Sequence, residues 1–333
     1  MTVRFHASDV DIDKAAKILR EGGTVAFPTE TVYGLGANAL DPAAVAKVFA
    51  AKGRPAWDPL IVHVSDRQML EAIAFVTPQA EKLIQSFWPG PLTFLLERTR
   101  KVPDAITAGR PLVGVRMPSH PLALAVIRAA GVPIAAPSAN RFGHTSPTTA
   151  DHVHEDLDGR IDAILDGGPT AVGVESTVLD PNQSPMLIYR PGAITPEMIE
   201  QVAGPVRIFQ PTRKPTETPA SLPSPGVGIR HYAPRAKLIL VANEAELHAK
   251  EEQLAAAGEK TGAMLPKHWT AKTAIEVFPW ADWQDEQALA QRLFAGLRDL
   301  DTRGVNTILC PLPSSTGIGT AIRDRLEKAA RTK

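Results

Sequence analysis

Two short polar clusters have the residue types of a phosphate-binding site. One is the Lys-Gly-Arg triplet at 52–54, and the other is the Ser-Ala-Asn triplet at 138–140. Each follows an apolar run or a helical pattern, so a fold can bring them together although they lie far apart in the chain. Either cluster alone would mean little, because a Lys-x-Arg triplet is most often solvated surface and Asn140 has the chemistry of a turn residue.

Two further cations stand at the ends of apolar segments, where a charge needs a partner. The four cations are Lys52, Arg54, Arg116 and Arg190, and the neutral donors that accompany them are Ser138, Asn140 and Ser146. Such a set suits a polyphosphate and a carboxylate. It can stabilise the charge that spreads over phosphate oxygens during in-line displacement.

Other kinds of site are poorly supported. Residues 258–261 only resemble a P-loop, because they lack its adjacent Gly-Lys pair. His152 and His154 would lie about 200° apart on a helix and could not converge on one metal ion. Ser176 lacks the flanking glycines of a hydrolase nucleophile, and Gly317 is better interpreted as part of a tight turn than as an anion site.

The elements that must position these residues alternate along the first 200 positions. Apolar residues at helical spacing predict an amphipathic helix from Ser8 to Gly22, and a second one after Ser119. Extended segments are predicted at 24–27, 60–64, 92–96, 113–117, 134–136, 163–165, 177–179 and 186–189. Since the last three lie close together and are joined by Gly, Pro and Asn, we expect hairpins and a mixed sheet.

The chain changes character at about position 204. Seven prolines and few large apolar residues between Gly204 and Pro234 indicate a semi-extended linker. Beyond it the pattern predicts strands at 237–241, near 262 and at 305–309, and helices at 244–257, at 285–300 and from 318. This alternation predicts a small parallel α/β domain, and the predicted domains are therefore 1–203, 204–235 and 236–333.

The composition sets broad limits on function. The length fits two domains at roughly 150 residues each. The 36 acidic and 36 basic residues balance, so no overall charge attracts nucleic acid or an anionic membrane, and anion binding must be local. The single Cys310 lies in an apolar stretch and predicts a buried thiol in a reducing compartment. With no signal-peptide pattern and no run of ~18 apolar residues, we expect a cytoplasmic protein.

Eight segments carry a resemblance to a known family. They are 27–36, 52–55, 87–93, 115–118, 136–140, 174–177 and 189–192, followed after the proline-rich stretch by 224–234. Through them the chain resembles the threonylcarbamoyl-adenylate synthases, in the long form with a C-terminal domain. The resemblance implies an α/β fold: a YrdC-like domain with a twisted mixed sheet and a positively charged concave face, a proline-rich linker, and a small Rossmann-like parallel α/β domain.

The resemblance also implies a nucleotidyltransferase. L-threonine and bicarbonate or CO2 give an N-carboxy-threonine, whose new carboxylate attacks the α-phosphate of ATP and expels pyrophosphate. The product, threonylcarbamoyl-adenylate, feeds a downstream tRNA threonylcarbamoyl transferase machinery that forms N6-threonylcarbamoyladenosine. No protein nucleophile is required, so such an enzyme supplies orientation and charge stabilisation.

Carried over by position, the resemblance implies roles for individual residues. L-threonine would be held by Thr31, His63, Arg116 and Ser176, with Arg116 clasping the carboxylate in two parallel hydrogen bonds. ATP would be held by Lys52, Arg54, Asp58, Ala136, Ser138, Asn140, Ser146, Arg190 and Tyr232. Among these residues Lys52, Arg54 and Arg116 are the predicted catalytic ones, and Ala136 would contribute backbone contacts only.

Several of these expectations concern charge. Asp58 stands where the family often has Asn, and its carboxylate would repel a triphosphate unless Mg2+ or Arg54 offsets it. His63 would either help to deprotonate the amine or position it. Mg2+ would bind together with ATP, coordinated by its phosphates rather than by a dedicated set of protein side chains. Arg54 and Arg116 are expected to be partly exposed, and the segment around Tyr232 is expected to act as a lid over the nucleotide.

Two alternatives stay open. One is an RNA-binding module that uses a basic concave sheet without catalysis. Aromatic residues make up only 5% of the chain and do not interleave with basic runs, which disfavours a stacking platform, although weak RNA binding is compatible with the pattern. The other is an enzyme that handles carbamoyl-adenylate, whose usual zinc-finger and acylphosphatase segments this sequence lacks.

Overall fold

A computed structural model describes residues 1–210, 221–224, 231–274 and 276–331. They divide into two compact units. The first unit spans Met1–Phe142, Pro147–Ala171 and Glu175–Gly228, and the second spans Gly143–Ser146, Val172–Val174 and Ile229–Lys333. The short segments Gly143–Ser146 and Val172–Val174 therefore belong to the second unit, although they precede the proline-rich stretch in the chain.

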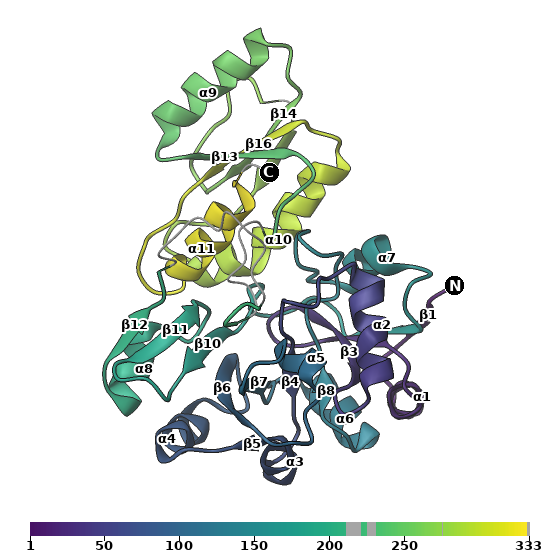
Figure 1. Ribbon diagram of the computed structural model, residues 1–333. Coiled ribbons are helices and arrows are strands. Elements are labelled where there is room, and N and C mark those ends of the chain that lie inside the picture. Colours follow the sequence, from purple (N-terminus) through teal and green to yellow (C-terminus); the bar gives the residue numbers. More distant parts are fainter. Residues whose placement is uncertain (211–220, 225–230, 275, 332–333) are drawn as a thin grey trace. The chain divides into compact units, whose positions relative to one another are not determined.

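The first unit is built on a mixed sheet, which has twelve strands among the described residues (Figure 1). The strands are β1 (Val3–Phe5), β2 (Val25–Pro28), β3 (Tyr33–Asn38), β4 (Ile61–His63), β5 (Ala74–Phe75), β6 (Leu92–Arg98), β7 (Leu112–Arg116), β8 (Ile134–Ala135), β9 (Ala163–Leu165), β10 (Thr177–Asp180), β11 (Met186–Arg190) and β12 (Val206–Ile208). Their order is β1-β9-β2-β3-β8-β4-β7-β6-β10-β11-β12, and β5 pairs with β6. Parallel and antiparallel pairs alternate irregularly, as the prediction of a mixed sheet requires.

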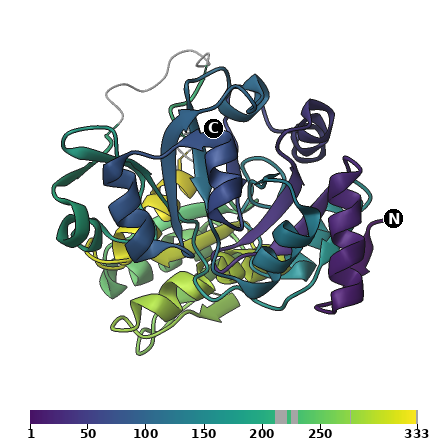
Figure 2. The same ribbon diagram turned by 90° about the horizontal axis from the view of Figure 1, so that it is seen from below.

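Helices pack against this sheet. They are α1 (Asp9–Arg20), α2 (Pro42–Lys52), α3 (Arg67–Ile73), α4 (Pro78–Phe87), α5 (Asp104–Thr107), α6 (Pro121–Ala130), α7 (Ala150–Leu157) and α8 (Pro196–Ala203). The predicted first helix is confirmed: the Ser8 side chain caps its N-terminus by accepting from the Asp11 amide. Figure 2 shows α1 as the purple helix nearest the N-terminus, and it shares an apolar core with α6 through Leu19 and Val126.

Two expectations about the first unit were wrong. The strands β10 and β11 form the predicted antiparallel hairpin, but β9 pairs in parallel with β1 and β2 in another part of the sheet. Parallel pairing joins segments that are distant in the chain, so nearness in sequence misled the prediction. Residues 206–208 were placed in the linker, yet they form β12 and pair with β11.

The second unit contains the predicted parallel sheet. Its strands are β13 (Lys237–Val241), β14 (Thr261–Leu265), β15 (Glu276–Pro279) and β16 (Thr307–Pro311), in the order β13-β16-β14-β15. All three strand pairs are parallel. Figure 1 shows α9 (Glu244–Ala256) on one side of this sheet and α10 (Glu286–Thr302) with α11 (Gly319–Ala329) on the other. The prediction missed β15, which is short and only partly buried.

The buried thiol was predicted correctly. Cys310 lies on β16 and is fully buried, and burial raises the pKa of its thiol well above the ordinary value. A raised pKa keeps the sulfur protonated and unreactive. Within the described ranges, no helix has the length and apolar character that crossing a membrane requires.

Candidate active site

A tight turn between β2 and β3 presents Glu30 and Thr31. The Thr29 hydroxyl accepts from the amides of Thr31 and Val32 at 3.2 and 3.3 Å, and it donates to the Val32 carbonyl at 2.7 Å. A threonine side chain that replaces backbone partners in this way stabilises a turn. Glu30 and Thr31 are buried, at 7% and 1% exposed, so the turn directs both side chains into the protein.

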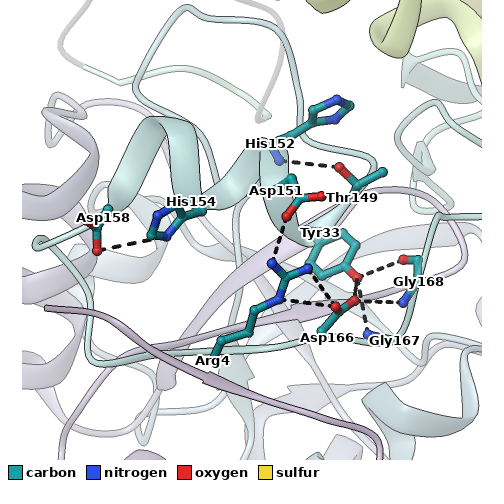
Figure 3. A network of polar contacts seen from close by, with 10 residues as sticks. All are labelled: Arg4, Tyr33, Thr149, Asp151, His152, His154, Asp158, Asp166, Gly167 and Gly168. Carbon is teal, nitrogen blue, oxygen red and sulfur yellow. Dashed lines mark hydrogen bonds and ion pairs between the residues drawn. The ribbon is translucent and has the colours of Figure 1, made fainter.

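A polar network holds Tyr33, the first residue of β3, in place (Figure 3). The Tyr33 hydroxyl donates to the Gly168 carbonyl at 2.7 Å and accepts from the Gly167 amide at 3.2 Å. Asp166 lies 3.3 Å from the same hydroxyl and forms an ion pair with Arg4 at 2.8 Å. Burial raises the pKa of the Tyr33 hydroxyl, which therefore stays protonated. The network fixes the start of β3, and with it the turn that carries Glu30 and Thr31.

Arg116, the last residue of β7, meets that turn. Its Nε donates to the Gly90 carbonyl at 3.2 Å and its Nη1 donates to the Thr31 hydroxyl at 2.9 Å. Its Nη2 lies 2.7 Å from the Glu30 carboxylate. The expectation that Arg116 is partly exposed was wrong, because the residue is only 4% exposed. A buried carboxylate and two oxygen acceptors provide the partners that such a charge needs.

His63 lies beside Arg116. The two residues are register partners at the ends of the parallel strands β4 and β7. His63 is 3% exposed, and burial, reinforced by the Arg116 charge, lowers the pKa of its imidazole to about 3. A ring that resists protonation this strongly is a poor proton acceptor. Of the two roles considered for His63, this low pKa favours positioning over deprotonation of an amine.

Ser176 and Arg190 are joined directly. Arg190, the last residue of β11, donates from Nε to the Ser176 carbonyl and from Nη2 to the Ser176 hydroxyl, both at 3.0 Å. The same hydroxyl lies 2.8 Å from the Thr93 hydroxyl. All three residues are buried. A residue predicted for ATP and a residue predicted for threonine are thus in contact.

Lys52 joins the two clusters with which the sequence analysis began. It ends α2, and Gly53 follows it with φ +63°, a left-handed conformation that favours glycine. From the sequence, this glycine was expected to allow close approach of a ligand. In the structure, the left-handed backbone conformation is the reason why glycine is favoured at this position. Lys52 Nζ donates to the carbonyls of Ser138 and Asn140 at 2.5 and 2.6 Å. The prediction that the fold brings these clusters together is confirmed.

Arg54 and Asp58 form a buried ion pair. Arg54 Nη2 lies 3.0 Å from Asp58 Oδ1, and the two side chains are 4% and 1% exposed. The guanidinium also donates to the carbonyls of Asp58 and Pro59 at 3.1 and 2.6 Å. Arg54 therefore offsets the Asp58 charge. From the sequence, Mg2+ and Arg54 were the two groups that could do so, and the structure shows Arg54 in this role. The expectation that Arg54 is partly exposed was wrong.

Charge couples these groups to one another. Burial raises the pKa of the Asp58 carboxyl, while the charges of Arg54, Lys52 and Arg190 act in the opposite direction. Burial, followed by repulsion from Arg54, lowers the pKa of Lys52 to about 7. Three basic residues act on Asp58, and Asp156 also acts on Lys52, so basic groups outnumber carboxylates in this cluster, which suits an anion.

The segment at 136–140 lies against Gly34. The Ala136 amide donates to the Ile61 carbonyl at 2.9 Å, so the backbone contact predicted for Ala136 would fall to its carbonyl. Ser138 pairs with Gly34 through a β-bridge and is partly buried, whereas Asn140 is buried. A Cβ on Gly34 would lie 3.2 Å from that of Ala136, so glycine permits this close approach.

Ser146 and Tyr232 belong to the second unit. Ser146 is fully buried. Tyr232 has φ +66°, its ring stacks on Phe294 at 5.8 Å, and the Arg325 guanidinium lies 5.2 Å from the ring centroid. The ATP contacts expected of both residues stay predictions. Of the expected lid, residues 211–220 and 225–230 lie outside the described part of the chain.

Sequence reasoning missed two residues of this cluster, Glu30 and Thr93. Both lie within segments that carried the family resemblance, but neither was singled out. For Glu30 a signal was available: it is the one charged residue in the stretch 25–36, which is otherwise apolar, hydroxylic or glycine. For Thr93 no pattern distinguishes a hydroxyl that faces Ser176 from one that packs in a strand.

Comparisons with known proteins cover nearly the whole chain. The family model described as "Telomere recombination" matches residues 17–192, and the one described as "Threonylcarbamoyl-AMP synthase, C-terminal domain" matches residues 194–331. The chain is 45% identical to the threonylcarbamoyl-AMP synthase of Pyrococcus abyssi, with 99% of this chain and 97% of that protein covered. It is 43% identical to the Bacillus subtilis synthase, with 99% and 96% covered. The crystal structure of P. abyssi Sua5 complexed with L-threonine superposes with a TM-score of 0.90 at 43% identity, covering 99% of this chain and 97% of that one.

Proposed function

Because this chain belongs to the threonylcarbamoyl-AMP synthase family, we propose that it forms threonylcarbamoyl-adenylate and pyrophosphate from L-threonine, bicarbonate or CO2, and ATP. The observation that carries this proposal is the pair of hydrogen bonds that Arg190 donates to Ser176. A predicted ATP ligand and a predicted threonine ligand share one buried network there. A reaction that joins an amino-acid derivative to a nucleotide needs its two substrates held side by side.

Arg116, Thr31, His63 and Ser176 bind L-threonine in this proposal. The presence of L-threonine in the complex of the P. abyssi relative supports this substrate. Arg116 Nη2 has no aligned hydrogen-bond acceptor among the described residues, so the guanidinium retains a donor for the substrate carboxylate. Neutral His63 positions the amino acid through its ring, because its low pKa disfavours a proton-accepting role.

Lys52, Arg54 and Arg190 bind the phosphates of ATP, together with Asp58, Ala136, Ser138, Asn140, Ser146 and Tyr232. The carbamate oxygen of N-carboxy-threonine forms a bond to the α-phosphorus as the bond from that phosphorus to the pyrophosphate oxygen breaks. Negative charge then develops on the leaving pyrophosphate, and the three cations stabilise it. The protein is accordingly a nucleotidyltransferase whose catalytic residues are Lys52, Arg54 and Arg116.

Mg2+ enters with ATP in this proposal, bound to its phosphates. Among the described residues, no group of three His, Cys, Asp or Glu side chains could hold a metal ion. The buried carboxylate of the cationic cluster, Asp58, is already paired with Arg54. In this proposal no residue of the chain is assigned to hold Mg2+, which would supply charge compensation on the ATP phosphates.

The burial of the cations disfavours the alternative of an RNA-binding module. Lys52, Arg54 and Arg190 are 3, 8 and 5% exposed, so they do not form the extended basic surface along which an RNA backbone binds. The proposed product is a mixed anhydride of a carbamate and a phosphate, which is an activated acyl donor. We therefore propose that a tRNA threonylcarbamoyl transferase machinery consumes it.

A pyrophosphate-release assay tests the proposal. The full-length protein is supplied with Mg2+, ATP and bicarbonate, and with L-threonine, L-serine or no amino acid. The expected result is release that depends on both bicarbonate and L-threonine and is weaker with L-serine. Release that is equal without an amino acid would refute the proposed function.

A further inference from the structure

Glu30 is a buried carboxylate that neither the sequence analysis nor the proposed mechanism uses. It is 7% exposed, and its Oε1 lies 2.7 Å from Arg116 Nη2. That contact is close but not aligned as a hydrogen bond, and among the described residues neither Glu30 oxygen has a hydrogen-bond donor. Glu30 is therefore paired with the charge of Arg116, but it accepts no hydrogen bond from the described residues.

Such an arrangement is unusual for a carboxylate with a purely structural role. Nearly all buried polar atoms in native proteins are hydrogen-bonded, because leaving an acceptor unsatisfied costs free energy. A structural ion pair at 2.7 Å would also gain from alignment, since charge-assisted hydrogen bonds are the strong ones. The acceptors of Glu30 and the Nη2 donor of Arg116 are thus both available to a ligand that carries donor and acceptor groups.

We propose that Glu30 binds the ammonium group of L-threonine while Arg116 binds its carboxylate. The inference rests on the proposed function and deepens it by assigning the amino-group contact of the same site. In an α-amino acid the two charged groups share one carbon, so the residues that bind them must be adjacent. Glu30 and Arg116 are adjacent, and Thr31 links them through its backbone and its bond to Arg116.

The surrounding charges agree with this role. His120 lies within electrostatic reach of Glu30, but burial lowers the pKa of its imidazole, which leaves it neutral. His63, beside Arg116, is neutral as well. A substrate ammonium would therefore meet a carboxylate with no competing imidazolium. Carboxylation turns the ammonium into a neutral carbamate nitrogen as its protons pass to solvent, and Glu30 then repels the new carboxylate.

The test compares L-threonine with the 2-hydroxy acid in which a hydroxyl replaces the ammonium. Isothermal titration calorimetry measures both ligands on the full-length wild-type protein, on Glu30→Gln and on Glu251→Gln. Glu251 is a matched control, because it is a buried glutamate (1% exposed) on α9 of the second unit. We expect the wild type and the control to bind L-threonine roughly 10- to 100-fold more tightly than the hydroxy acid, as a charge-assisted hydrogen bond implies.

Glu30→Gln is expected to lose most of that preference by weakening L-threonine binding, with the affinity for ATP unchanged. An unchanged preference in Glu30→Gln would overturn the inference and leave the proposed function standing. A wild type that binds neither ligand would overturn both. If circular dichroism shows that Glu30→Gln is unfolded, the wild-type ratio decides: equal affinities for the two ligands would overturn the inference, and a strong preference for L-threonine would support it.

Discussion

Replacing His63 with glutamine should remove part of the protein's acid sensitivity. Burial lowers the pKa of His63 from 6.5 to about 3 in the folded protein. Between these values the unfolded chain binds a proton that the folded chain does not, so stability falls as the pH drops below 6.5. Each pH unit in this window corresponds to about 1.4 kcal/mol. From pH 6.5 to pH 5 the loss attributable to His63 is therefore about 2 kcal/mol.

The assay is urea unfolding of the wild type and of His63→Gln at pH 8 and pH 5. Other titrating groups contribute equally to both proteins, so the difference between the two pH-dependent losses isolates His63. Histidine NMR gives a second readout: the resonance absent from the variant should not titrate between pH 5 and pH 8. A His63 resonance that titrates near pH 6.5, or a variant that loses as much stability as the wild type, would refute the reasoning.

Three further outcomes are expected. Arg54→Ala should lower the free energy of unfolding by about 3–5 kcal/mol, because it leaves Asp58 buried without its ion pair. Adding Asp58→Asn should recover part of that loss in urea unfolding, and a single variant as stable as the wild type would contradict the account. Lys52 has a pKa of about 7, so at pH 8 the binding of ATP should cause it to take up as much as about one proton. Calorimetry in buffers of different ionisation enthalpy measures this proton uptake, and Lys52→Met should abolish it. Tyr33→Phe should cost about 1–3 kcal/mol in thermal unfolding, because the Gly168 carbonyl loses a buried donor, whereas an unchanged midpoint would show that the network in Figure 3 does not hold the turn.

The local pattern of the sequence was enough to predict where most elements lie and where key side chains stand on them. Lys52 ends a helix, and Arg116 and Arg190 end strands, as the apolar periodicity indicated. The meeting of 52–54 with 138–140 was also predicted, and the Lys52 bonds to the Ser138 and Asn140 carbonyls are its physical form. The end of the helix and the ends of the strands depend on periodicity and on turn residues, which are local properties of a chain.

Other non-local features were beyond such reasoning. The parallel pairing of β9 with β2 depends on the whole crossover between them. The burial of Arg54 depends on Asp58 being beside it and on the layers that cover both. Glu30 was overlooked because a carboxylate in an apolar segment reveals its role only when the guanidinium that faces it is known.

The most direct test of the account follows labelled carbon into the product. The protein is incubated with Mg2+, ATP, L-threonine and 13C-bicarbonate, and the nucleotide products are analysed by mass spectrometry. The account predicts an adenylate that contains threonine and one 13C atom, formed together with pyrophosphate. Pyrophosphate accompanied only by AMP, or an adenylate without the labelled carbon, would contradict it.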